Sequence, residues 1–250
     1  MTAPRFANLL FSGRCNLRCP HCIGRQLPGP DVDNLELYPP KNLDLFCHLL
    51  RERGIRELSL TGTNTDPLLY RHLPELIAAL RRRVPEVRLS LHSNGLLVLP
   101  LVHVVNRCHR LALSLPSFDP DTCLAMTGRR LAIDLELVLQ RVQVPVKVST
   151  LVTPHNLAEI PAIVARCRAL GVRRMALRRL YGDETPLDLL PGQAPVRFFG
   201  NQPVYDCDGM EVTVWRFEQS ALECLNLFAD GFIGDRYLLA HNRPPQAEAA

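Results

Sequence analysis

The stretch Cys15-Asn16-Leu17-Arg18-Cys19-Pro20-His21-Cys22 brings three cysteines together at the spacing C-x3-C-x2-C. It directly follows an apolar run, residues 6–11, which predicts a short buried strand. Thiolates are soft ligands that suit iron–sulfur clusters, zinc and Cu(I). No fourth cysteine follows in register, so a 4Fe–4S cluster bound here keeps one iron open to a further ligand.

The composition is that of an ordinary globular protein. The 250 residues are 47% hydrophobic and 22% charged, which suffices for one barrel-sized domain or two small ones. No run reaches the ~18 apolar residues of a membrane span, and the first residues lack the regions of a signal peptide. We therefore expect a cytoplasmic protein that does not enter a membrane.

Six further cysteines are scattered along the chain without a second C-x2-C, at Cys47, Cys108, Cys123, Cys167, Cys207 and Cys224. An odd total of nine argues against a disulfide framework, and the scatter argues against a second metal cluster. The net charge is +4, with arginines in short runs but no interleaved aromatic residues. We expect no nucleic-acid partner.

Strand and helix patterns alternate along most of the chain. Strands are expected at 6–11, 55–60, 87–92, 111–115, 144–152 and 172–180, and helices at 43–53, 68–83, 101–108, 131–141 and 156–171. A further helix begins at Pro120, with Asp119 as its N-cap. This order predicts an α/β fold with a parallel sheet, closed by right-handed crossovers into a partial or full barrel.

Irregular segments separate and follow these elements. Residues 25–42 form a long loop rich in Pro, Asp and Asn, of the kind that often serves as a functional lid. Residues 181–195 are expected to be loop, and 211–217 and 223–227 to be strands that pair as a hairpin-like lid. The polar segments 61–67, 93–95 and 116–120 follow strands, so they gather at the carboxyl edge, where parallel α/β folds bind ligands.

The cysteine motif resembles that of the radical S-adenosylmethionine (SAM) superfamily, in which His21 stands at a position usually held by an aromatic residue. The resemblance implies a partial (β/α)6 TIM-like barrel at residues 1–182. The pattern beyond it predicts a short C-terminal β extension at 183–241 that closes the barrel, and a disordered tail at 242–250. It also implies a 4Fe–4S cluster on Cys15, Cys19 and Cys22, and SAM bound to the open iron. SAM is then cleaved to a 5′-deoxyadenosyl radical that takes hydrogen from a substrate.

Further stretches are similar to the superfamily's SAM-binding motifs, above all those of the cyclases acting on GTP in molybdenum-cofactor synthesis. The stretch TGTNTDP replaces a G-G-E-P-type motif, is two residues longer and carries aspartate for glutamate. Other matches are HSNG, LSLPSFDP, VKVSTLV and MALRRLYG. The resemblance implies cofactor contacts at His21, Gly62, Thr63, Asp66, Ser114, Ser149 and Leu180, and substrate contacts at Ser93, Lys147 and Arg178. The residues alone leave a second interpretation open, in which Asp66 only caps the helix that follows the strand.

The second cysteine triad of those cyclases is absent, so we do not expect the GTP-cyclase activity itself. Arginines near 178 and the region of Trp215 are the expected substrate contacts, and the basic side chains favour an anionic small molecule. The cluster implies an electron donor such as a flavodoxin or ferredoxin. Two alternatives stay open: a zinc or iron–sulfur sensor or scaffold without turnover, and an enzyme that transfers a fragment of SAM.

Overall fold

The protein is described from a computed structural model that covers residues 6–26, 32–219 and 223–236. Eleven strands form one sheet in the order β11-β10-β1-β2-β3-β4-β5-β6-β9-β8-β7. They are β1 Phe6–Phe11, β2 Glu57–Gly62, β3 Arg88–Ser93, β4 Arg110–Ser114, β5 Val146–Leu151, β6 Arg174–Arg178, β7 Arg197–Phe199, β8 Gln202–Cys207, β9 Met210–Trp215, β10 Glu223–Leu227 and β11 Ile233–Arg236. All pairs from β10 through β1–β6 to β9 are parallel.

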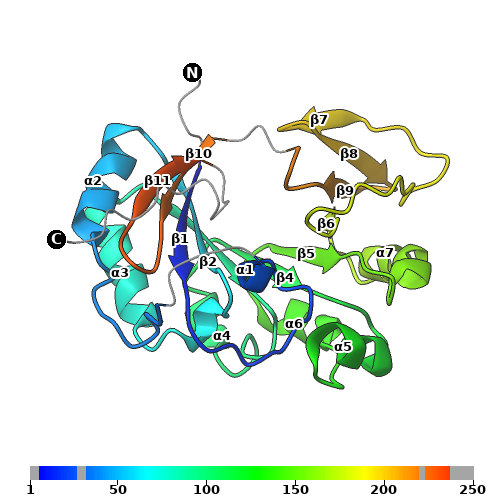
Figure 1. Cartoon of the computed structure of the whole chain (residues 1–250), viewed down its shortest axis with the longest axis horizontal. Coiled ribbons are helices and arrows are strands. Elements are labelled where there is room, and N and C mark those ends of the chain that lie inside the picture. The colour runs from blue at the N-terminus through cyan, green and yellow to red at the C-terminus, as the bar shows by residue number, and fades with distance from the viewer. Residues whose placement is uncertain (1–5, 27–31, 220–222, 237–250) are drawn as a thin grey trace.

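Helices follow the first five strands, and all except the short α1 lie along the outside of the curved sheet (Figure 1). They are α1 Ile23–Gln26, α2 Leu43–Glu52, α3 Leu73–Arg83, α4 Val102–Val105, α5 Pro120–Thr127, α6 Leu135–Arg141 and α7 Ile160–Ala169. The two edges of the sheet do not pair, which leaves the barrel open. The predicted partial barrel is confirmed, although β6 is followed by irregular chain rather than by a helix.

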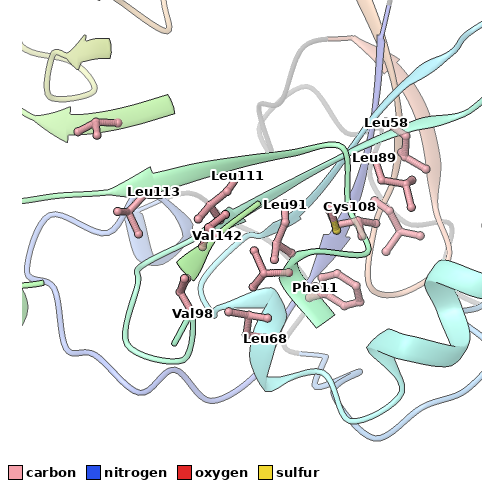
Figure 2. Packing of buried hydrophobic residues seen from close by; sticks show 14 of the residues in the cluster. Phe11, Leu58, Leu68, Leu89, Leu91, Val98, Cys108, Leu111, Leu113 and Val142 are labelled. Carbon is pink, nitrogen blue, oxygen red and sulfur yellow. The ribbon is translucent and has the colours of Figure 1, made fainter. Parts of the chain in front are cut away.

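The outer face of the sheet carries the hydrophobic core. In β3, Leu89 and Leu91 are 0% exposed and pack with Leu58 and Phe11 beneath the helices (Figure 2). The alternate residues of β2 and β3 are polar and point to the inner face, because successive side chains of a strand point to opposite faces. The alternation of apolar and polar residues along these strands therefore produces an apolar outer layer and a polar inner face.

The predicted hairpin between residues 211–217 and 223–227 is wrong. Strand β9 pairs with β6, and β10 pairs with β1, so the two strands lie on opposite sides of the core strands. Asn8 of β1 donates a buried 2.8 Å hydrogen bond to Asn226 of β10, across 218 residues of chain. This polar pair is one contact that favours β1 as the neighbour of β10.

Several helix boundaries differ from the expected ones because caps lie inside the expected ranges. The 68–83 helix is split, since Asp66 caps a 3-10 turn at Pro67–Leu69 and α3 begins only at Leu73. The 131–141 helix starts at Leu135, where the Asp134 carboxylate accepts from the N–H of Leu137. The predicted start of α5 is confirmed, with Asp119 accepting from two backbone N–H groups.

Some expectations fall outside the described residues. Residues 27–31 of the long loop and the tail at 242–250 lie outside the described residues, and residues 25 and 26 belong to α1. The domain division at residue 182 stays a prediction. No described helix combines the length and the apolar character that crossing a bilayer requires.

Replacing Leu91 by alanine tests the outer core. The side chain is fully buried, so the L91A substitution is expected to lower the free energy of unfolding by about 2–5 kcal/mol. Urea unfolding of the reduced protein, followed by circular dichroism, measures the change. Leu45, which is 52% exposed on α2, is the matched control, and L45A is expected to cost less than about 0.5 kcal/mol. Equal losses in both variants would contradict this assignment of the core.

Candidate active site

The three motif cysteines lie in a loop between β1 and α1, and all are half-buried free thiols. The N–H of Leu17 points at the sulfur of Cys15, 3.4 Å away, and the N–H of Cys22 donates to the carbonyl of Cys19. The N–H of Arg18 donates to the carbonyl of Thr127 at 2.8 Å, which ties the middle of the loop to the end of α5.

The cysteine loop packs directly on the turn after β2. A Cβ on Gly24 would lie 2.0 Å from the carbonyl oxygen of Thr63, so only glycine permits this approach. The Asn64 side chain accepts from the hydroxyl of Ser12 and the N–H of Gly13, both at 3.1 Å. Two segments that the resemblance assigns to cluster and SAM are therefore one packed unit.

The thiols are close enough to influence one another. Burial raises the pKa of Cys19 to about 11, with further increases from Cys22 and Cys15. Burial also raises the pKa of Cys15. Within the described residues, however, no three His, Cys, Asp or Glu side chains converge tightly enough to hold a single metal ion.

Asp66 is 2% exposed and acts as a structural acceptor. Its carboxylate accepts from the N–H of Leu68 at 2.9 Å, from the hydroxyl of Ser93 at 2.9 Å and from the N–H of Asn94 at 2.6 Å. Burial raises the pKa of Asp66, and these hydrogen bonds partly offset that increase. The contact with the N–H of Leu68 is that of a helix cap, which is the alternative that the sequence left open for Asp66. The roles of Asp66, Gly62 and Thr63 toward SAM stay predictions.

Ser93, assigned to substrate, is 3% exposed and is engaged with Asp66. Its neighbour Asn94 was missed by the sequence assignments and lies at the cysteine loop. The Asn94 amide donates to the side chain of Asn16 at 2.7 Å and lies 3.9 Å from the sulfur of Cys15. The polar HSNG stretch signalled a turn at this point, but the sequence could not show which of its side chains reaches the cysteines.

Basic side chains gather on the inner face of the sheet. His92, Ala112 and Lys147 occupy one register row across β3, β4 and β5. Lys147 makes no hydrogen bond or ion pair with any described residue. Burial lowers its pKa to about 8, with a further decrease from Arg178 and Arg174. Burial, with Arg178 and Lys147, likewise lowers the pKa of His92 to about 3, so the imidazole is neutral.

The remaining predicted residues lie toward the carboxyl ends of the strands. Ser114 and Ser149 are register partners on β4 and β5, the first exposed and the second buried. Arg178 pairs in register with Trp215 and stacks 5.8 Å from the ring of Phe217. Leu180 lies just beyond the end of β6. His21, which lies between Cys19 and Cys22 in the sequence, has its ring 6.4 Å from the ring of His155.

One buried arginine was also missed. Arg179 is 1% exposed, forms a 3.1 Å ion pair with Asp183 and donates to the carbonyl of Thr185 at 2.6 Å. It fixes the start of the irregular segment after β6. The resemblance assigned Arg178 to substrate from the match of MALRRLYG to a superfamily segment, and it gave no signal for the structural role of Arg179.

The comparisons with known proteins agree with this geometry. The family model described as Radical SAM superfamily matches residues 9–174. A protein of Methanocaldococcus jannaschii described as "Probable GTP 3',8-cyclase" is 22% identical over 94% of this chain and 83% of its own length. The GTP 3',8-cyclase of Syntrophomonas wolfei is 32% identical over 50% of this chain and 38% of its own length.

Solved structures with the same fold contain bound SAM. The Streptococcus suis SuiB structure bound to S-adenosylmethionine has a TM-score of 0.57 at 16% identity, over 73% of this chain and 42% of that chain. The anSMEcpe structure with bound AdoMet has a TM-score of 0.53 at 14% identity, over 74% of this chain and 55% of that chain. At these identities the likeness concerns the fold alone.

Lys147 offers a direct test of the inner face. The sequence has only two lysines, so ¹³C-dimethylation gives two lysine side-chain signals, with exposed Lys41 as the internal reference. The Lys147 signal is expected to titrate near a pKa of about 8. Because the folded pKa lies below the unfolded one, stability should rise with pH between those values, up to about 10.4. A Lys147 midpoint above about 10 would contradict the desolvated inner face.

Proposed function

The chain belongs to the radical SAM superfamily, and on that premise we propose that Cys15, Cys19 and Cys22 hold its 4Fe–4S cluster. The protein is an enzyme whose cofactors are this cluster and SAM. The reaction that these cofactors supply is reductive cleavage of SAM to methionine and a 5′-deoxyadenosyl radical, which abstracts hydrogen from a substrate. The observation that carries the cysteine assignment is the packing of their loop, through Gly24, on the turn after β2.

The substrate that we propose is a small anionic molecule bound on the inner face. Lys147 and Arg178 supply positive charge there, and neutral His92 supplies a hydrogen-bonding group. The nearest acid to Lys147, Glu211, is already paired with Arg174 and Arg197. A phosphate or carboxylate would provide the counter-charge that the desolvated lysine lacks, because a buried charge is costly unless it is paired.

We do not assign GTP as the substrate. The cysteines beyond residue 182 are Cys207 on β8 and Cys224 on β10, both buried and on separate edges of the sheet, so they do not supply a second cluster triad. Nine free thiols and an oxygen-sensitive cluster support a reducing, cytoplasmic setting, with a flavodoxin or ferredoxin as electron donor. The described strands of the proposed C-terminal extension, β7–β9 and β10–β11, form the two open edges of the barrel.

Anaerobic reconstitution with iron and sulfide, then reduction by dithionite with SAM present, tests the proposed reaction. Mass spectrometry is expected to show 5′-deoxyadenosine from the wild-type protein and none from the C19A variant, because its cluster loses one of three ligands. The C108A variant, which removes a buried cysteine distant in sequence, is the matched control and should retain the product. A loaded cluster with intact SAM would favour a sensor, and a different SAM fragment would favour a transferase.

The anionic substrate class has a separate test. Inorganic pyrophosphate added to the dimethylated protein is expected to raise the pKa of Lys147 by about 1 unit or more, because a nearby anion stabilises the charged lysine. Sodium chloride at equal ionic strength is the control ligand, and Lys41 is the control site. If the Lys147 midpoint moves no more than in chloride, the inner face does not bind this class of anion.

A further inference from the structure

Four arginines surround the cysteine loop on its solvent side, and we call them the cluster rim: Arg14, Arg18, Arg25 and Arg129. All four are exposed, and none forms an ion pair with any residue that the structure describes. By contrast, the neighbouring Arg130 is neutralised by Asp121 at 2.5 Å. The rim therefore carries uncompensated positive charge beside the proposed cluster.

Backbone contacts hold the rim in place. The carbonyl of Arg14 accepts from the hydroxyl of Thr65, and the N–H of Arg18 donates to Thr127. The Arg129 guanidinium donates to the carbonyl of Asn16 at 2.9 Å, so the turn after α5 is joined to the loop. Figure 1 shows the cysteine loop passing beside α5. The charges thus belong to a fixed surface built from two segments.

Apolar side chains lie within this surface. Leu124, in the last turn of α5, is 44% exposed, and Leu131, two residues after Arg129, is 55% exposed. Protein interfaces typically combine a few apolar contacts with a charged or polar rim. Exposed Asp33 lies against Gly13 at the start of the cysteine loop. The end of α5 and the turn after it add two exposed leucines to the exposed arginines of the rim.

We propose that the cluster rim, with Leu124 and Leu131, is the docking surface for an acidic protein that carries single electrons. This rests on the proposed function, because only a redox cluster here needs an electron. SAM and substrate would occupy the inner face, so the electron reaches the cluster from the solvent side. The carrier is oxidised by one electron and the cluster reduced by one, with no bond formed or broken and no proton transferred. Opposite charge on the carrier accelerates such an encounter and makes it salt-dependent.

The test compares two charge-reversal variants of the reconstituted holoenzyme. In the first, Arg14→Glu and Arg18→Glu reverse two rim charges whose guanidinium groups make no hydrogen bond or ion pair with described residues. In the second, Arg53→Glu and Arg82→Glu make the same change in net charge before β2 and β3, at the opposite end of the sheet. A flavodoxin is the probe, with binding measured by calorimetry and cluster reduction by loss of visible absorbance.

We expect the rim variant to bind flavodoxin at least about tenfold more weakly at low salt, with cluster reduction by flavodoxin slowed in proportion. The control variant should match the wild type, and the difference should shrink in high salt. Dithionite should reduce all three proteins. Equal flavodoxin binding by all three proteins overturns the docking proposal. Failure of dithionite-driven SAM cleavage in the wild type would instead overturn the proposed function.

Discussion

The contact between the cysteine loop and the turn after β2 is the constraint on which the rest of the site depends. Gly24 lies so close to the Thr63 carbonyl that no side chain fits between them. Asn64 and Thr65 add hydrogen bonds to the start of the same loop. Because β1 and β2 are register partners along their whole length, the two turns emerge at one height. The sheet thereby places the sulfurs of the motif cysteines beside the polar carboxyl ends of the strands, and a short loop is enough to carry them.

The polar interior depends on the apolar exterior. Leucines on the outer face of β2, β3 and β4 are sealed under the helices, and this leaves the inner positions free to carry polar residues. A lysine on that inner face is desolvated, and the neighbouring arginines add to the cost of its charge. The positive charge of Lys147 costs stability, and a bound anion would reduce that cost. Perturbed pKa values of this kind are typical of functional sites.

Much of the core could be predicted from the sequence, because alternation and helical spacing are local signals. The six strands before residue 182 and the Asp119 cap were found in this way. The partners of β9 and β10 could not be found, since alternation identifies a strand without naming its neighbour. The Asn8–Asn226 bond joins residues 218 positions apart, and nothing near either asparagine in the sequence indicates it.

The site residues likewise divide into those that a local sequence signal identifies and those that depend on contacts between distant segments. The cysteine spacing is local and could be read directly, whereas the contacts of Asp66 and Asn94 depend on how three strands are arranged. The Asp66 carboxylate holds the backbone of Asn94, and the Asn94 amide reaches Asn16 and the sulfur of Cys15. A buried aspartate in the turn after β2 thus orders the turn after β3, and that turn contacts the cysteine loop after β1. Burial and three protein donors make Asp66 part of the framework of the site, which a cap preference in the sequence could only partly indicate.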